Sequence, residues 1–123
     1  MLLNSLFILS LLTVPGLAFS STILVVGDSL SASYGIPVEQ GWVALLQQRL
    51  SAQCGECTIV NASISGDTTA SARARLPKAI ERHQPDIVIL ELGGNDGLRG
   101  LSLAEMKANL AAMISTAQSH EAR

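Results

Sequence analysis

Three short, mainly apolar runs recur along the chain, and a turn of small polar residues follows each of them. The runs are Ile23–Gly27, Thr58–Asn61 and Asp86–Leu92, and their starts lie about 30 residues apart, the spacing of strand–helix–strand units. They show no regular alternation with polar residues, which is typical of strands buried on both faces of a parallel sheet. The pattern therefore predicts an α/β fold.

The segments between and after these runs have helical spacing. One helix is expected over Trp42–Leu50, with Gly55 as its stop, and one over Thr68–His83, where Pro77 divides the helix or opens a new turn. The apolar positions expected to face the core in the first of them are Trp42, Leu45, Leu46 and Leu50.

A third helix is predicted to begin at Ser102, because Glu105 three residues later completes a capping box. Its expected apolar stripe consists of Leu103, Met106, Leu110, Met113 and Ile114. The order β-α-β-α-β-α implies right-handed crossovers and one parallel α/β unit, without an internal repeat or a linker.

The N-terminal part of the chain is apolar and carries no charged side chain before Asp28. The run Leu6–Val14 is followed by Pro15 and Gly16, which break a helix. Ala18 and Ser20 then place small residues at the two positions that a signal peptidase reads. These features are typical of a secretory signal. The segment before the run has no Lys or Arg, so an uncleaved membrane anchor is the alternative interpretation.

We accordingly expect residues 1–20 to be a signal peptide and residues 21–123 to be the domain, with no stable membrane span after cleavage. The protein is then expected to be periplasmic or secreted, exported by a bacterial Sec-type route.

Composition excludes several kinds of partner and cofactor. The formal net charge is −2 and the chain has four aromatic residues, so we expect no basic patch, no stacking surface and no nucleic-acid partner. Cys54 and Cys57 form a single C-x-x-C after a predicted helix, where they fit a local loop disulfide better than a redox site. No second ligand pair accompanies them, so no metal site is predicted.

The turns after the three strands are where chemistry is expected, because ligands bind at the carboxyl ends of the strands in such sheets. These turns are Gly27–Leu30, Asn61–Asp67 and Gly93–Asp96, and all are rich in Gly, Ser, Asn and Asp. They contain neither a dinucleotide-binding glycine motif nor the Lys of a phosphate-binding loop. They also lack the G-x-S-x-G nucleophile elbow.

The sequence Gly27-Asp28-Ser29-Leu30 resembles the GDSL signature of the SGNH hydrolases, and two further blocks of that family follow in order. The resemblance implies that Ser29 is the nucleophile, that the Gly66 N–H contributes to the oxyanion hole and that the Asn95 amide completes it. The run Gly93–Gly100 is similar to the secreted bacterial arylesterases, acyl-CoA thioesterases and lysophospholipases.

This resemblance implies a three-layer α/β/α, flavodoxin-like fold whose parallel sheet has the order 2-1-3-4-5. The matched part ends after strand three and its helix, so we interpret residues 21–123 as a partial SGNH hydrolase domain, truncated before strands four and five. Strand three is then expected to be an exposed apolar edge.

The family's fourth block, Asp-x-x-His, is absent, so the general base and its orienting Asp are missing from these 123 residues. His83 precedes the third strand and is expected at the far edge of the sheet from Ser29, and His120 lies in the last four residues. The resemblance implies that an acyl ester or thioester is hydrolysed through an acyl-enzyme on Ser29, without a cofactor. Because the base is missing, we expect this chain to be inactive as given. Acyl-chain preference, the choice among ester, thioester and lysophospholipid, and oligomeric state stay open.

Two alternatives come from other functional classes. A non-catalytic protein that binds an acyl ligand, or a decayed fragment of an esterase, would share the same motifs. A response-regulator receiver shares the sheet order and has acidic residues where Asp28 and Asp96 stand, but the Lys that it requires near its last strand is missing.

Overall fold

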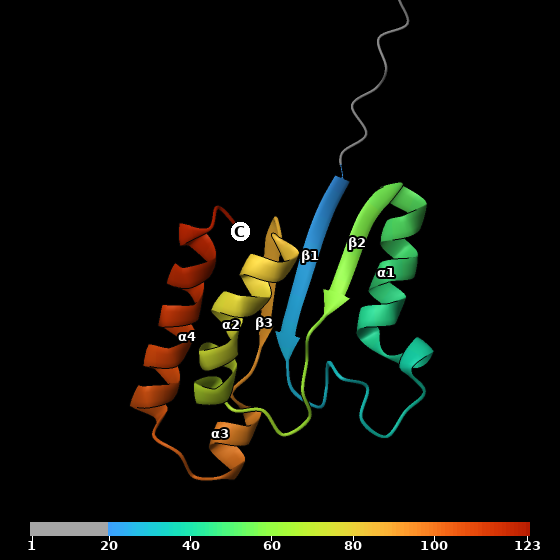
Figure 1. Ribbon diagram of the computed structural model, residues 1–123. Coiled ribbons are helices and arrows are strands. Elements are labelled where there is room, and N and C mark those ends of the chain that lie inside the picture. Colours follow the sequence, from blue (N-terminus) through green and yellow to red (C-terminus); the bar gives the residue numbers. More distant parts are fainter. Residues whose placement is uncertain (1–19) are drawn as a thin grey trace, which may run out of the picture.

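A computed structural model describes residues 20–123, and the expected signal peptide lies almost wholly outside this range (Figure 1). The strands are β1 (Ser20–Gly27), β2 (Glu56–Asn61) and β3 (Ile87–Glu91). The helices are α1 (Trp42–Gln53), α2 (Thr69–His83), α3 (Gly94–Leu98) and α4 (Leu103–Ser119), with a short 3-10 helix at Val38–Gln40. No helix within residues 20–123 is long and apolar enough to span a membrane.

The three strands form one parallel sheet with the order β2-β1-β3, as predicted for the first three strands of the fold. In this register Val25 of β1 pairs with Asn61 of β2, and Gly27 pairs with Glu91 of β3. Because parallel strands end at the same side, the three following turns lie together at one edge, the lower edge in Figure 1.

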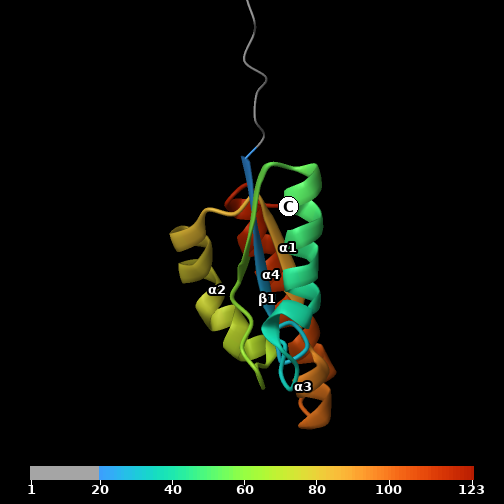
Figure 2. The same cartoon turned by 90° about the vertical axis from the view of Figure 1, so that its right-hand side faces the viewer.

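Helices lie on both faces of the sheet, which gives three layers. Figure 2 shows α1 and α2 on opposite sides of the strands. The α2 and α4 helices pack against each other and cover the face from which Leu24 and Val26 project. Their buried residues complete the main core there: Ala72, Leu76, Ile80, Met113 and Ala117. Val25, which is also fully buried, alternates to the α1 side.

The helices differ from the prediction in which residues they bury. In α1 the buried side chain is Val43, whereas Leu45 is exposed. In α4 the capping box is present, because the Ser102 hydroxyl accepts the Glu105 N–H at 3.3 Å, but Leu103 and Ile114 are exposed. Each of these helices packs against other elements on one narrow side only. The apolar periodicity therefore predicted more buried positions than the structure has.

Two local features were also predicted incorrectly. The α2 helix continues through Pro77 because Leu76 and Ile80, on either side of it, are buried in the core and hold both halves in line. The turn after β3 is not a simple loop, since residues 94–98 form the short helix α3, entered through Gly93 at φ +117°.

Cys54 and Cys57 are joined by a disulfide, with Cα atoms 5.4 Å apart. The bond links the end of α1 to the start of β2, which agrees with the predicted local loop disulfide. It stabilises a connection at the edge of the sheet opposite to the three strand-end turns.

Both outer strands have partners along part of their free edges. The Gln47 side chain of α1 donates to the Cys57 carbonyl at 3.0 Å and accepts the Ile59 N–H at 2.7 Å, which covers part of the β2 edge. Along β3, the Arg123 N–H donates to the Asp86 carbonyl, and the Val88 N–H donates to the Arg123 carbonyl. The predicted open β3 edge is therefore paired at its first residues.

Candidate active site

The Asn95 side chain connects all three strand-end turns. Asn95 belongs to α3 after β3, and its amide nitrogen donates to the Asp67 carbonyl at 2.9 Å and to the Asp28 carboxylate at 3.4 Å. Asp28 follows β1 and Asp67 follows β2. One amide thus brings into contact three segments that the sequence places up to 67 residues apart.

Ser29 lies beside this junction on the turn after β1. The Asp28 side chain is buried and accepts the Leu30 N–H at 3.0 Å, and the Ser29 carbonyl accepts the Tyr34 N–H at 3.1 Å. Ser29 itself is half-buried. Within residues 20–123 its hydroxyl has no hydrogen-bond partner, so no base in this part of the chain holds its proton.

Gly66 adopts the left-handed conformation, with φ at +82°, in the turn after β2. A Cβ at this position would lie 3.7 Å from the Arg99 guanidinium, so the strain would come from the backbone and not from a clash. Arg99 donates to the Gly66 carbonyl at 2.8 Å. This contact orients the peptide that follows Gly66.

Arg75 of α2 holds the same turn from the other side. Its guanidinium pairs with the buried Asp67 carboxylate at 2.6 Å and donates to the Ala62 carbonyl, also at 2.6 Å. Two guanidinium nitrogens, Nε and one terminal nitrogen, donate to the same Asp67 oxygen, and such charge-assisted hydrogen bonds are strong. Arg75 and Arg99 could not be predicted from the sequence, because no local pattern indicates which of the charged side chains folds back onto a turn.

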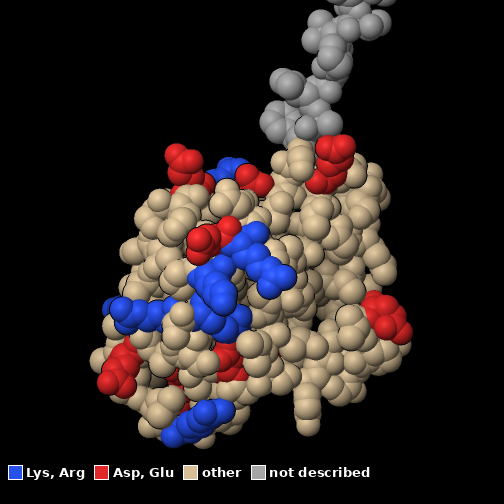
Figure 3. Space-filling model, in the orientation of Figure 1, with Lys and Arg blue, Asp and Glu red and all other residues tan. Residues whose placement is uncertain are grey.

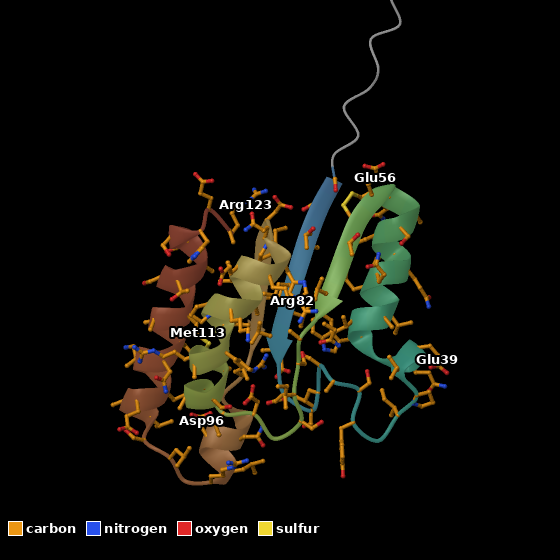
Figure 4. The ribbon with its side chains drawn as sticks, in the orientation of Figure 1. Glu39, Glu56, Arg82, Asp96, Met113 and Arg123 are labelled. Atoms are coloured by element: carbon orange, nitrogen blue, oxygen red, sulfur yellow. A yellow bond between two sulfur atoms is a disulfide. The ribbon has the colours of Figure 1, made fainter. Side chains whose placement is uncertain are left out.

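Asp96, next to Asn95, is buried and is a structural residue (Figure 4). Its two oxygens accept the Thr69 N–H at 2.9 Å and the Thr69 hydroxyl at 2.6 Å. Thr69 is the first residue of α2, so the carboxylate also lies at a helix N-terminus, where the dipole favours negative charge. Asp96 therefore fixes α3, and with it Asn95, against α2.

Both histidines of the chain lie at the opposite edge of the sheet. His83 ends α2 immediately before β3 begins, and His120 follows α4, three residues before Arg123 pairs with Asp86 and Val88 at the start of β3. A strand the length of β3 separates the two edges by about 16 Å at roughly 3.3 Å per residue. Neither imidazole is within hydrogen-bonding reach of Ser29.

Basic side chains are grouped on the helix α2. Figure 3 shows a group of Lys and Arg side chains, and α2 carries half of the basic residues of the chain: Arg73, Arg75, Lys78 and Arg82. The low net charge did not predict this grouping.

The two aromatic residues of the described range, Tyr34 and Trp42, lie on the other connection, between β1 and β2. In that same range, no three His, Cys, Asp or Glu side chains are grouped as a metal would require.

The chain is similar in sequence to a known family and to several characterised proteins. A model of the GDSL-like lipase/acylhydrolase family matches residues 25–123. The chain is 49% identical over 115 residues to esterase TesA of Pseudomonas aeruginosa, a match that covers 94% of this chain and 57% of that one. It is 45% identical over 93 residues to thioesterase 1/protease 1/lysophospholipase L1 of Escherichia coli K12, covering 76% of this chain and 43% of that one.

The structure shows the same relationship. A crystal structure of TesA superposes with a TM-score of 0.82 at 51% identity, over 84% of this chain and 57% of that one. The chain thus spans about half the length of the relatives that it matches, from 43% to 57%, and over the part that superposes on TesA the fold is the same.

Proposed function

The chain belongs to the GDSL-like lipase/acylhydrolase family, the family of the SGNH hydrolases, and on that premise we propose that Ser29 is the nucleophile of an acyl-ester or thioester hydrolase. The observation that carries the proposal is the Asn95 amide, which meets the turn of Ser29 and the turn of Gly66 at one point. Three motif blocks that are separate in sequence are therefore one site in space.

In the proposed reaction the Ser29 oxygen attacks the substrate carbonyl and negative charge develops on the carbonyl oxygen. The Gly66 N–H and the Asn95 amide donate to that oxygen, each contributing about 3–4 kcal/mol to the stability of the transition state. Both Asn95 hydrogens are engaged in the structure, so the weak 3.4 Å contact with Asp28 is the one to be exchanged for substrate. A base takes the Ser29 proton and returns it to the alcohol or thiol as that group leaves, and water, deprotonated by the same base, then releases the acyl group from Ser29.

The surface around the site suits an acyl chain. Large apolar side chains are exposed on the turns and short helices at this edge of the sheet: Leu30, Tyr34, Ile36, Val38, Ile64, Leu98 and Leu101. Such a concentration of exposed apolar groups is typical of a binding surface. The relatives' names include esterase, thioesterase and lysophospholipase, and we propose a substrate of this class, a small acyl ester or thioester, without assigning the leaving group.

Turnover also requires a base, and we propose that these 123 residues do not supply one. The Ser29 hydroxyl has no partner among the described residues, and His83 and His120 lie at the other edge of the sheet. A chain without the base but with its oxyanion donors retains a fraction of catalysis, about 10³-fold over water in enzymes lacking one triad residue.

The test uses the 123-residue chain with p-nitrophenyl butyrate, with and without added imidazole. We expect little hydrolysis alone and a rise with imidazole, which accepts the Ser29 proton. The rise should be lost in Ser29→Ala and kept in Ser115→Ala, an exposed serine of α4. All rates are taken above the rate of imidazole alone, because imidazole itself cleaves p-nitrophenyl esters. A protein-dependent rise that survives Ser29→Ala contradicts the nucleophile, and fast Ser29-dependent turnover without imidazole contradicts the missing base.

A binding protein without catalysis is the second candidate. It is favoured by the Ser29 hydroxyl, which has no partner among residues 20–123, together with the exposed apolar side chains around it. It predicts saturable binding of a fatty acid by the chain with no imidazole-dependent acylation. The two candidates are separated by the same experiment, since only the first forms a covalent acyl-Ser29.

We further propose that residues 1–20 direct export to the periplasm or the exterior, with 21–123 as the mature domain. The apolar run Leu6–Val14 and the break at Pro15 support this proposal. Mass spectrometry of the exported protein in a bacterial host should find Ser21 as the N-terminus. A product that keeps residues 1–20 and stays with the membrane contradicts cleavage.

A further inference from the structure

Ser31, two residues after Ser29, is fully buried and connects three elements through its side chain and backbone. Its hydroxyl donates to the Glu91 carboxylate at the end of β3, at 2.7 Å, and accepts the Trp42 indole N–H from the start of α1, at 3.2 Å. Its carbonyl accepts the Asn61 amide from the end of β2, at 2.8 Å. The turn that carries Ser29 is thus attached to both neighbouring strands.

The direction of these hydrogen bonds is fixed by chemistry. An indole N–H can only donate, so it occupies the acceptor side of the Ser31 oxygen, and the Ser31 hydrogen must go to the Glu91 carboxylate. Within residues 20–123 Glu91 forms no ion pair. Burying a carboxylate without a cation costs free energy, and Glu91 takes no part in the reaction proposed above. Its hydrogen bond to Ser31 is therefore the contact from which a role can be inferred.

Gly27 lies against the side chains of Ser31 and Glu91. Gly27 pairs with Glu91 in the sheet register, and a Cβ at this position would lie 2.6 Å from the Ser31 Oγ and 3.0 Å from the Glu91 carboxylate. Its backbone is not left-handed, so the requirement for glycine here is one of space. The absence of a side chain at Gly27 therefore leaves the space in which the Glu91 side chain reaches across the strand end to Ser31.

The turn between these anchors is short and internally bonded. The Ala32 N–H donates to the Asp28 carbonyl and the Tyr34 N–H donates to the Ser29 carbonyl, at 2.9 and 3.1 Å. A displacement of Ser31 is therefore passed to Ser29 by the backbone, since only Leu30 lies between them. Misplacement of a reacting group by about 1 Å can cost about 10²-fold in rate.

We propose that Glu91 is a positioning residue for the candidate nucleophile, acting through Ser31, and that Trp42 reports the state of this link. The inference rests on the proposed function of Ser29, to which it adds a residue that does not touch the substrate. Trp42 is the one tryptophan of the chain, so its fluorescence comes from the network itself.

The test compares Glu91→Leu, which removes the acceptor, with Glu91→Gln, whose amide oxygen can still accept the Ser31 hydroxyl. Ile80→Val, a core substitution near the far end of α2, controls for stability alone. We expect Glu91→Leu to shift Trp42 emission and to lower the imidazole-dependent rate of Ser29 acylation by p-nitrophenyl butyrate about tenfold or more. Glu91→Gln should restore the rate to within about twofold, and Ile80→Val should leave rate and emission unchanged.

Acylation at the wild-type rate in folded Glu91→Leu overturns the proposal, as does an equal loss in Glu91→Gln and Glu91→Leu. If wild-type Ser29 is not acylated at all, the proposed function fails. The role of Glu91 in holding the turn is then tested by amide hydrogen exchange alone. Exchange at Ala32 and Tyr34 should then be about tenfold faster in Glu91→Leu than in the wild type and in Ile80→Val. Equal exchange in the three proteins overturns it.

Discussion

Asp96 shows how one buried side chain can set the geometry of a site in which it takes no direct part. Replacing it with Ala leaves the Thr69 N–H and hydroxyl without their acceptor inside the protein. We expect Asp96→Ala to lower the free energy of unfolding by about 2–4 kcal/mol, since each unsatisfied buried group costs about 1–3 kcal/mol. Urea denaturation measures this difference.

Glu81→Ala is the matched control, because Glu81 is an exposed carboxylate on the same helix α2. It should change stability by less than about 0.5 kcal/mol. Similar losses in the two variants would show that Asp96 contributes only charge and not a specific pair of hydrogen bonds.

Gly27 gives a second prediction at the scale of the residue. Gly27→Ala puts a methyl group against Ser31 and Glu91, and we expect it to cost about 1–3 kcal/mol as overpacking. In Gly55→Ala the methyl group meets open space, and the backbone there is not left-handed, so no loss is expected. Thermal unfolding of the two variants compares them directly, and an equal effect contradicts the steric account.

The sequence predicted which turns form the candidate site, but not which side chains hold those turns in place. The ends of parallel strands meet, so the three turns were expected at one edge, and the family resemblance selected Ser29, Gly66 and Asn95 within them. Glu91 and Ser31 could not be paired, since 60 residues separate them and neither belongs to a recognisable local pattern. Contacts of this kind depend on the register of β1 against β3, which periodicity does not specify.

At the scale of the element, the outer strand β2 depends on one glutamine. Gln47 makes two hydrogen bonds with the β2 backbone, at Cys57 and Ile59, as a neighbouring strand would do. We expect Gln47→Ala to lower the free energy of unfolding by about 1–2 kcal/mol and to speed amide exchange at Ile59. Gln48→Ala, at the exposed neighbouring position, should leave both unchanged. Equal exchange at Ile59 in both variants would contradict the role of Gln47.

The elements themselves were largely predictable, and the exceptions have physical reasons. The parallel sheet and the capped start of α4 followed from the sequence pattern, and the strand order followed from the family resemblance. The short helix α3 did not, because two glycines lie within it and its stability comes from the bonds of Asp96 to Thr69. Pro77 was read as a break, yet tertiary packing of Leu76 and Ile80 outweighs its local cost.

At the scale of the whole molecule, β3 is the less protected side of the sheet. Arg123 pairs with the backbone at Asp86 and Val88, and the side chains of Val88, Leu90 and Ile114 line a small apolar groove. We expect the 123-residue chain to associate as its concentration rises, because such surfaces bury one another. Size-exclusion chromatography should show less association for Ile114→Lys than for Ser115→Lys, a neighbouring exposed position on α4. Equal association would contradict the assignment of this face.

The central claim is that the turns after β1, β2 and β3 form one acylation centre around Ser29. Peptide mass spectrometry after incubation with p-nitrophenyl butyrate and imidazole tests it most directly, in the wild type and in Asn95→Ala, with folding checked by circular dichroism. The account predicts a butyryl group on Ser29 that forms about 10²-fold or more slowly in folded Asn95→Ala. A butyryl group spread over other serines, or formed on Ser29 at the same rate without Asn95, would contradict it.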